Sequence, residues 1–377
     1  MKIGILVTKT ENFNKIEHYY SQEVGLAREL DARGHEVTVY KCIPKTNHYM
    51  KSRNFNFCIH YYPSFHLGIH GYFNCKNLSK NLDCLIVFSD KQIFMPHIFR
   101  FCNKNNIICV PYIELTHSKK LKAKIADFLF KIGTLKYYKT TEVVAKSEFI
   151  KNELKEMGID EVSVAPVGID KQKMNLTFRN RDRNEIRKEY NYRSLDKIIL
   201  FTGNEQEKMV KLFRKVHNVN HNTRLLIIGE TEIKTFIKQI KLQDYVQVIK
   251  PRHHESMWKI HYMVDDYIDL SRDETFNKTM MEAIVYDTRV IAYYSTAHDT
   301  ILSDLQGHFL CNDAREAYEF LLKKADTYLL QQSSNKMLEI FDWKTMSEII
   351  EKIIKKRHTH NNNTETDLVD FDEDFLY

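Results

Sequence analysis

Short apolar runs alternate with amphipathic stretches in the first half of the chain. Residues 3–7 form one apolar run, Val24, Ala27 and Leu30 have helical spacing, and residues 36–40 form a second run after Gly34. This order predicts a strand, a helix and a parallel strand. Further strands are expected at 82–88, 107–112, 143–145 and 162–166, and a helix capped by Ser147 is expected before Gly158.

The second half repeats this alternation. A charged, Asn-rich stretch at 171–194 is expected to be a linker between an N-terminal domain (1–170) and a C-terminal domain (195–340). Strands are predicted at 198–202, 224–228, 246–249, 266–270 and 290–293. The chain therefore reads as an α/β protein with two tandem Rossmann-like, doubly wound domains, which bind ligands in the cleft where they face each other.

The end of the chain differs from the two domains. An amphipathic helix is expected over 341–357, packing back toward the N-terminal domain, with isoleucines from 349 to 354 on one side. The remaining residues, 358–377, are polar and acidic, and we expect them to be disordered. They end in Phe375, Leu376 and Tyr377, which makes this acidic tail a candidate docking element for a protein partner.

Several protein classes are disfavoured. No apolar run approaches the ~20 residues that span a bilayer, and the first strand begins without a leader. The seven cysteines are odd in number and contain no Cys-x-x-Cys pair, so we expect reduced thiols and neither a disulfide framework nor a zinc site. These features predict a cytoplasmic protein.

The charge is distributed unevenly. The net charge is +6, but the residues after Arg357 include six acids and no Lys or Arg, so the rest of the chain carries +12. A body this basic favours anionic partners, such as phosphorylated substrates, membrane headgroups or nucleic acid. No nucleic-acid recognition motif accompanies the charge, so nucleic acid is the least favoured of the three.

Two glutamates separated by seven residues form the strongest chemical signal. Glu274 is expected in the loop after a strand, and Glu282 about two turns into the following helix. The free amides at the helix start attract a phosphate, one carboxylate can accept hydrogen bonds from a ribose diol, and the other can reach a sugar ring. These groups suffice to hold a nucleotide-sugar. The alternative is that both are solvated acids on a helix surface.

This pattern, Ser271 to Ala283 followed by Val290-Ile291-Ala292, resembles that of retaining GT-B glycosyltransferases, especially glycosyltransferase family 4. The resemblance covers roughly residues 2–356. It also rests on four further stretches with the family's order: Leu26 to Val39, Val144 to Phe149, Val164 to Asp170 and Leu226 to Glu230.

The resemblance implies roles for individual residues. Glu274 matches the catalytic, donor-sugar glutamate, and His117 matches a histidine near the reacting sugar, although a histidine packed at the cleft rim is the plain alternative. The donor-binding residues that it implies are Glu282 for the ribose, the helix start at Asn277, Lys278 and Thr279 for the diphosphate, and Gly203 with Lys208 beside it. It implies no metal and no cofactor, because helix dipoles and cations neutralise the leaving diphosphate.

The chain also departs from the family pattern. The loop from Thr10 to Gln22 lacks the usual glycines, Asn204 stands where an arginine is expected, and Lys208 is one residue early. Asn277 and Asp287 replace glycines, and both residue types tolerate left-handed backbone. The donor site is therefore expected to be altered, with its carboxylates retained.

A basic stretch runs from Lys119 to Lys139, with seven lysines and one acid. Its apolar residues fall at helical spacing, which favours an amphipathic helix on an anionic membrane surface. The alternative is a helix that packs on the core and exposes its lysines to solvent. If the first reading holds, the protein is peripheral on the inner face of the cell membrane.

Together these features and the resemblance imply an enzyme: a metal-independent hexosyltransferase in cell-surface polysaccharide or glycoconjugate synthesis. That it is a retaining enzyme rests on the resemblance alone. It would move a sugar from a nucleotide-diphosphate sugar to a glycan, glycolipid or protein-linked acceptor. One rival is a degenerate GT-B protein that acts as a non-catalytic glycan-binding or stabilising subunit. A second is a GT-B sugar-nucleotide epimerase, which needs no acceptor.

Overall fold

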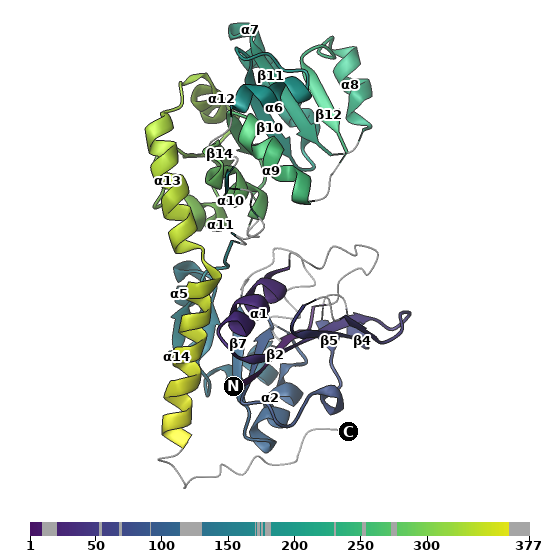
Figure 1. Cartoon of the computed structure of the whole chain (residues 1–377), viewed down its shortest axis with the longest axis vertical. Helices are drawn as coiled ribbons and strands as arrows, with labels where there is room; N and C mark the ends of the chain where they lie inside the picture. The colour runs from purple at the N-terminus through teal and green to yellow at the C-terminus, as the bar shows by residue number, and fades with distance from the viewer. Residues whose placement is uncertain are drawn as a thin grey trace. The chain divides into compact units, whose positions relative to one another are not determined.

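The computed structural model describes residues 1–9, 21–52, 55–67, 70–90, 92–113, 130–169, 171, 174, 176–177, 182–229, 231–250, 254–272 and 277–361. The chain divides into two compact units (Figure 1). Unit 1 comprises Met1–Lys146, Ile150–Ala165 and Trp343–Tyr377, and unit 2 comprises Ser147–Phe149 and Pro166–Asp342. The N-terminal unit is therefore completed by the C-terminal end of the chain.

Unit 1 is built on a sheet with the strand order β3-β4-β2-β1-β6-β7-β8-β9, in which β5 pairs with β4. Strands β3 and β5 are antiparallel to β4, and the other neighbours are parallel. Its described elements are β1 (Lys2–Val7), α1 (Gln22–Ala32), β2 (Glu36–Pro44), β3 (Met50–Ser52), β4 (Cys58–Leu67), β5 (His70–Tyr72), η2 (Cys75–Asn77), β6 (Cys84–Phe88), α2 (Met95–Lys104), β7 (Ile108–Ile113), η3 (Phe130–Thr134), α4 (Leu135–Tyr138), β8 (Val143–Ala145), α5 (Glu148–Glu156), β9 (Val162–Val164) and α14 (Trp343–Asn361).

Unit 2 contains a fully parallel sheet with the order β12-β11-β10-β13-β14-β15. Helices lie on both of its faces, as expected for a doubly wound domain (Figure 1). Its described elements are α6 (Arg183–Glu189), β10 (Lys197–Thr202), α7 (Gln206–Val219), β11 (Thr223–Ile228), α8 (Ile233–Gln239), β12 (Val246–Ile249), α9 (His254–Met263), β13 (Asp266–Asp269), α10 (Lys278–Val285), β14 (Arg289–Tyr293), α11 (Thr296–Leu302), β15 (Phe309–Cys311), α12 (Ala314–Leu322) and α13 (Thr327–Ile340).

The predicted strands correspond to observed ones, and several of them are continuous apolar runs. In β7 all six residues are buried, which is typical of a parallel strand covered by helices on both faces. The ends of the predicted helices also agree with the structure. Gly34 has a φ of +85° just after α1, and the amide of His35 donates to the carbonyl of Leu30.

Four strands were not predicted: β3, β4, β5 and β15. β4 alternates buried residues with half-exposed or exposed histidine and aromatic residues, so it has no apolar run. Within the stretch expected to be a linker, 171–194, residues Arg183–Glu189 form helix α6. Its Arg187 is buried and donates to the carboxylate of Asp265 at 2.8 Å, which ties this helix to the amino end of β13.

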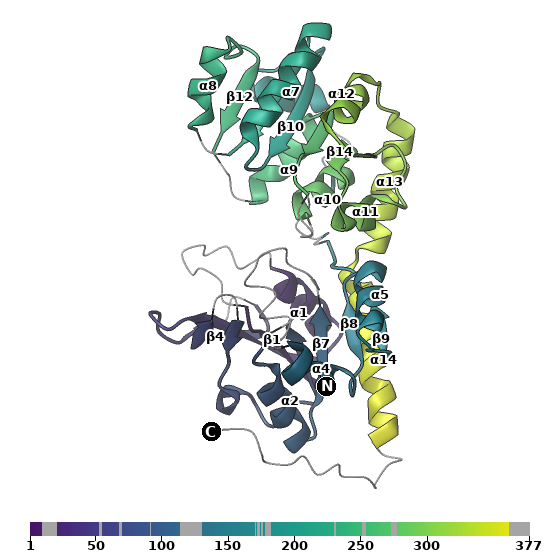
Figure 2. The ribbon, with the colours of Figure 1, turned by 180° about the vertical axis from the view of Figure 1, so that it is seen from behind.

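The predicted C-terminal helix is α14, which packs on α1 within unit 1. The indole of Trp343 occupies the space where a side chain at Gly25 of α1 would lie. Arg33 donates two hydrogen bonds to Glu351, at 2.7 and 3.0 Å, and His35 lies 2.9 Å from the same carboxylate. Figure 2 shows α14 from behind, beside β9. Lys356 and Arg357 of this helix pair with Glu161, which precedes β9.

Two predicted features lie largely outside the described residues. The helix α14 continues to Asn361, into the segment expected to be a disordered tail, and residues 362–377 are not described. In the basic stretch from Lys119 to Lys139, only residues 130–139 are described. They form η3 and α4, with Ile132 66% exposed.

Candidate functional site

The predicted donor-binding residues of unit 2 lie at the carboxyl edge of its sheet. Strands β10 and β13 are neighbours and parallel, so their carboxyl ends meet at one edge. Gly203 follows β10 and leads into α7, which carries Lys208, while Asn277 follows β13 and leads into α10. Two helix starts therefore open at the same edge, which is where doubly wound sheets bind their ligands.

Asn277 is the N-cap of α10. Its side-chain oxygen accepts a hydrogen bond from the amide of Met280 at 3.1 Å, and its amide nitrogen donates to Asp269 Oδ2 at 2.5 Å and to the hydroxyl of Tyr267 at 3.1 Å. Its φ is −89°, so it does not use the left-handed backbone that asparagine tolerates. Its role is instead to cap α10 and join it to β13. Asp287, by contrast, does lie in the left-handed region, with a φ of +59°.

Asp269, at the end of β13, is the centre of this hydrogen-bonded group. Besides Asn277, it accepts from the amide of Ser271 at 2.8 Å and lies 3.3 Å from Nε2 of His298. The other ring nitrogen of His298 is 2.7 Å from the carbonyl of Tyr293. Burial opposes ionisation of Asp269, but the hydrogen bonds from His298 and Ser271 outweigh it, and the pKa of the carboxyl lies below its ordinary value.

The group extends to the neighbouring strand. The hydroxyl of Tyr267 lies 2.9 Å from Oγ1 of Thr202, the last residue of β10. A continuous hydrogen-bonded path therefore joins β10, β13 and the starts of α10 and α11. Tyr267, Asp269 and His298 were not among the predicted site residues. The sequence does contain a signal, because Asp266 and Asp269 flank the short apolar stretch of β13. Connecting Asp269 with His298, however, requires knowledge of the strand register.

Glu282 lies in the middle of α10, and its side chain is only 14% exposed. Its Oε2 atom is 3.6 Å from Nε2 of His261, a fully buried residue of α9. The alternative of a solvated surface acid therefore does not describe Glu282. Lys278 and Thr279, in the first turn of the same helix, are half-buried.

Gly203 and Lys208 occupy the β10–α7 turn and the first turn of α7. Gly203 has a φ of +154°, a conformation that L side chains rarely adopt. Lys208 points to solvent with 67% of its side chain exposed, and its ammonium lies 2.6 Å from Glu205. Lys211, the other candidate cation, is 65% exposed and 3.8 Å from Glu207. Both cations are thus already paired with acids of the same helix start.

The two predicted catalytic residues, Glu274 and His117, lie outside the described residues. Within the described ranges, no group of three or more His, Cys, Asp or Glu side chains is arranged to hold a metal ion. All seven cysteines are described, and each is a free thiol. No helix in the described part of the chain is long and apolar enough to cross a membrane.

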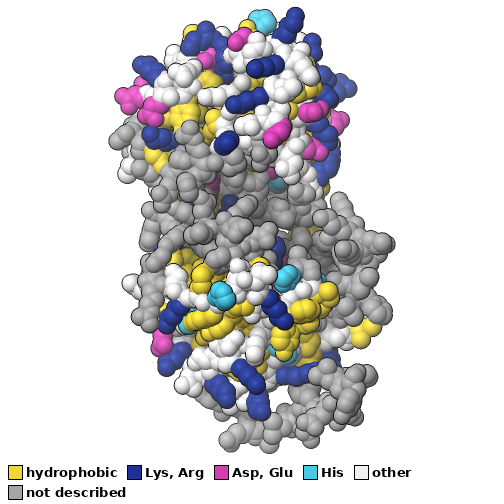
Figure 3. Space-filling model, turned by 90° about the vertical axis from the view of Figure 1, so that its right-hand side faces the viewer, with side chains coloured by type: hydrophobic (Ala, Val, Ile, Leu, Met, Phe, Trp, Pro, Cys, Tyr) yellow, Lys and Arg dark blue, Asp and Glu magenta, His cyan; other side chains and the backbone are white. Residues whose placement is uncertain are grey.

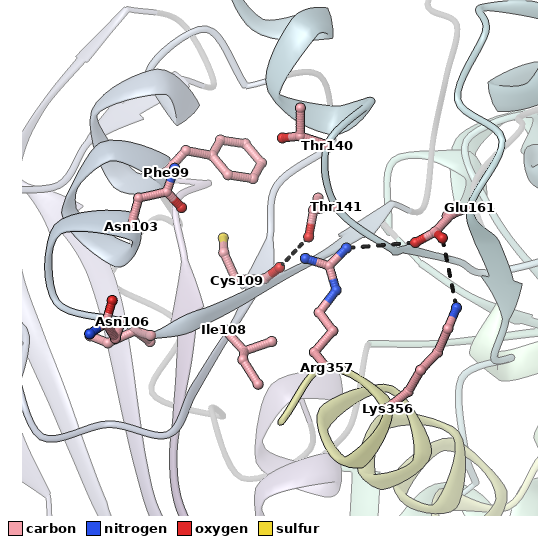
Figure 4. Close-up of a pocket in the computed structure, with 11 residues that line it drawn as sticks. Phe99, Asn103, Asn106, Ile108, Cys109, Thr140, Thr141, Glu161, Lys356 and Arg357 are labelled. Carbon is pink, nitrogen blue, oxygen red and sulfur yellow. Dashed lines mark hydrogen bonds and ion pairs between the residues drawn. The ribbon is translucent and has the colours of Figure 1, made fainter. Parts of the chain in front are cut away.

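Unit 1 contains a polar pocket of about 570 Å³ at the amino edge of its own sheet (Figure 4). Residues that precede or begin β7, β8 and β9 line it, together with the end of α14. In Figure 4 the carboxylate of Glu161 faces both Arg357 and Lys356, each 3.7 Å away. The charges in this pocket pair with one another and fasten α14 to the sheet.

Comparisons with known proteins agree with this geometry. Residues 182–340, which make up most of unit 2, match the model of the family described as glycosyl transferases group 1. No curated protein sequence matches the chain.

Three solved structures illustrate the similarity of fold. Sucrose-phosphate synthase from Thermosynechococcus elongatus has a TM-score of 0.69 at 13% identity, with 96% of this chain and 100% of that one covered. A glycosyltransferase from Rickettsia africae has a TM-score of 0.66 at 16% identity, with 94% and 98% covered. Anabaena HepE in complex with UDP-glucose has a TM-score of 0.64 at 11% identity, with 94% and 99% covered.

These matches span nearly the full length of both chains, so they concern the whole two-unit architecture. The predicted fold class is confirmed: the chain has the GT-B fold of glycosyltransferases, and its second unit carries the sequence pattern of glycosyl transferases group 1.

Proposed function

We propose that this protein is a retaining glycosyltransferase that takes a nucleotide-diphosphate sugar as its donor in unit 2. The observation that carries the proposal is the geometry of α10. Its start is capped by Asn277 at the carboxyl edge of the sheet, and the carboxylate of Glu282 is largely buried one turn deeper. The family match over residues 182–340 covers this helix.

Each part of α10 has a role in the proposal. The start of α10, with Lys278 and Thr279, binds the diphosphate, because a helix start carries a partial positive charge that favours an anion. Glu282 accepts hydrogen bonds from the ribose hydroxyls. Glu274 positions the transferred sugar and stabilises the positive charge that develops on its ring, with His117 on the acceptor side. The acceptor enters on the face that the diphosphate leaves, which retains the configuration.

The test is calorimetric titration of wild type and Glu282→Ala with a panel of nucleotides and nucleotide-sugars. Loss of a charged hydrogen bond to a buried ribose should weaken binding by roughly 1.5–3 kcal/mol, or about 10- to 150-fold. Glu319→Ala is the matched control, because Glu319 is a 55% exposed helical glutamate of the same unit. Equal affinities of wild type and Glu282→Ala for every ligand would contradict the proposed site.

The rival function is that of a non-catalytic subunit that binds glycan or stabilises an active partner. One observation favours it: Lys208, the expected diphosphate cation, is paired with Glu205 and largely exposed. An assay for sugar release from the bound donor, with and without candidate acceptors, distinguishes these functions. Transfer supports the enzyme, binding without turnover supports the rival, and conversion of the donor alone into an isomer supports an epimerase.

The remaining partners stay predictions. We propose a glycan, glycolipid or protein-linked acceptor, no metal or other cofactor, and a role in cell-surface polysaccharide or glycoconjugate synthesis. Contact with an anionic membrane through Lys119 to Lys139, a protein partner for the acidic tail, the absence of nucleic acid binding and a cytoplasmic location are likewise proposals that follow from the sequence.

A further inference from the structure

Large apolar side chains are exposed together on one part of unit 1. Of the thirteen large hydrophobic residues that are exposed in the described part of the chain, five fall within residues 49–72. They lie on β3, β4 and β5 or directly beside them, and their exposed fractions range from 39% to 57%. We call four of them the hairpin surface, which consists of Met50, Phe65, Leu67 and Tyr72 together with Lys45.

The strand pairing relates four of these residues, whereas the ring of Tyr49 packs with His60 and Tyr62 and so points to the face of β4 opposite that of Met50 and Tyr61. Phe65 is directly opposite Tyr72 in the β4–β5 pair, and Leu67 is opposite His70. On the other side of β4, Met50 is opposite Tyr61. The lower part of Figure 3 views unit 1 from the side of β4, where hydrophobic side chains gather with His, Lys and Arg side chains between them.

Packing from beneath holds the exposed rings in place. Tyr72 stacks on His97 with ring centroids 4.6 Å apart, and the edge of Phe94 meets it at 5.6 Å. Phe65 also contacts Phe94, at 6.4 Å, and the ammonium of Lys45 lies 5.5 Å from the centre of the Phe65 ring. Because these side chains are ordered before binding, burying them against a partner costs little further side-chain entropy.

The segment that forms this surface contains no acid. Residues 37–82 include no Asp or Glu, although they include six Lys or Arg and four His. One of the cations, Lys41, is buried in an ion pair with Glu23. Lys45, Lys51, Lys76 and Lys80 are exposed. The hairpin surface therefore combines apolar and aromatic side chains with positive charge alone.

We propose that the hairpin surface docks this protein onto an anionic lipid membrane. Leu67 and Met50 gain free energy only where an apolar phase covers them, and a lipid interface provides one whereas a soluble anionic sugar does not. Tyrosine favours the interface because one end of the ring is apolar and the hydroxyl stays hydrated. The lysines meet the negative headgroups, and no carboxylate in the segment opposes them.

This docking is separate from the donor site. The hairpin surface belongs to unit 1, and every residue proposed to bind the nucleotide belongs to unit 2. Membrane binding can therefore be measured without substrate, and its failure leaves the proposed glycosyltransferase activity untouched.

The experiment is sedimentation of the full-length protein with two kinds of vesicle, one of phosphatidylcholine alone and one that contains phosphatidylglycerol. We expect wild type to bind the anionic vesicles, and added salt to weaken that binding. The variant Phe65→Ala/Leu67→Ala should bind roughly tenfold more weakly, and Lys45→Gln about fivefold more weakly. Leu195→Ala/Tyr328→Ala is the matched control, since these residues of unit 2 are 81% and 65% exposed, and it should bind like wild type.

Three results would overturn the proposal. Wild type fails to bind either vesicle, the Phe65→Ala/Leu67→Ala variant binds as well as wild type, or wild type binds a soluble sulfated oligosaccharide but no vesicle. Circular dichroism and thermal unfolding of each variant show whether its fold is intact. If Phe65→Ala/Leu67→Ala does not fold, Phe65→Ser and Leu67→Ser are tested singly.

Discussion

The imidazole of His261 lies directly behind Glu282. The two side chains approach to 3.6 Å between Nε2 and Oε2, although His261 is fully buried and Glu282 is 14% exposed. Neither ring nitrogen of His261 has a hydrogen-bond partner in the structure. A buried polar ring without partners costs free energy, and such a cost is most often tolerated where the group serves a function.

We therefore expect His261→Leu to separate stability from ligand binding. Removing an unpartnered buried polar group is nearly neutral or slightly stabilising, so the free energy of unfolding should change by less than about 1 kcal/mol. Nucleotide affinity should fall by roughly three- to tenfold, because Glu282 loses the group that orients it. Chemical unfolding and calorimetric titration measure the two quantities. A large loss of stability with unchanged affinity would show that His261 only fills space.

Asn277→Asp and Asn277→Ser should differ in stability, although aspartate and serine cap an exposed helix start about equally well. Aspartate normally caps a helix as well as asparagine does, but here it would place a second carboxylate against Asp269, which Asn277 now contacts at 2.5 Å. We expect Asn277→Asp to destabilise unit 2 more than Asn277→Ser. The serine variant keeps the cap and should cost about 1 kcal/mol. Thermal unfolding at pH 7 gives the ranking, and equal stability of the two variants would show that the contact with Asp269 is weak.

Gly25→Ala should destabilise the protein although alanine favours a helix by about 1 kcal/mol over glycine. The added methyl group would overlap the indole of Trp343, and overpacking of this kind costs about 1–3 kcal/mol. The double variant Gly25→Ala/Trp343→Leu should recover part of the loss, because the smaller side chain makes room. A stabilising effect of Gly25→Ala alone would mean that α14 does not rest on α1 in solution.

The ion pair between α1 and α14 predicts a pH dependence. Hydrogen bonding from Arg33, opposed by partial burial and helped by His35, lowers the pKa of Glu351 from 4.5 to about 2. A carboxylate with a lowered folded-state pKa stabilises the fold above its unfolded value, and this contribution is lost as the pH falls from about 4.5 toward 2.

Accordingly, Glu351→Gln should be less stable than wild type at pH 7 by roughly 1.5–3 kcal/mol, and the difference should shrink at pH 3. Chemical unfolding at the two pH values measures it. Glu348→Gln is the control, because Glu348 is 52% exposed and 3.6 Å from Arg33, where a surface pair contributes at most about 1 kcal/mol. A difference that does not depend on pH would rule out the ionised pair as its cause.

The sequence predicted the parts of this fold that depend on local pattern. Strands such as β7 were found because every residue is apolar. Strands β3, β4 and β5 were missed, since His60, Ser64 and His66 interrupt the apolar residues of β4. At Asn277 the sequence identified an unusual residue but not its hydrogen bond to Asp269.

What could not be predicted depends on contacts between distant segments. Asp269 and His298 are brought together by the register of β13 with β14. The spacing of the two residues along the chain does not predict this contact. The same is true of Trp343 and Gly25, which are separated by most of the sequence.

The discontinuous composition of unit 1 has a consequence during protein synthesis. The surface of α1 that contacts Trp343 emerges from the ribosome early. The helix that covers it, α14, is synthesised only after residues Pro166–Asp342. At translation rates of about 5–20 residues per second, those roughly 180 residues take on the order of 10–35 s. Unit 2, by contrast, is nearly continuous, and its ends meet where the amide of Ile169 donates to the carbonyl of Phe341 at 2.7 Å. The second unit of the nascent chain can therefore finish folding before the first. Until α14 is synthesised, the apolar side of α1 that it covers is accessible to chaperones.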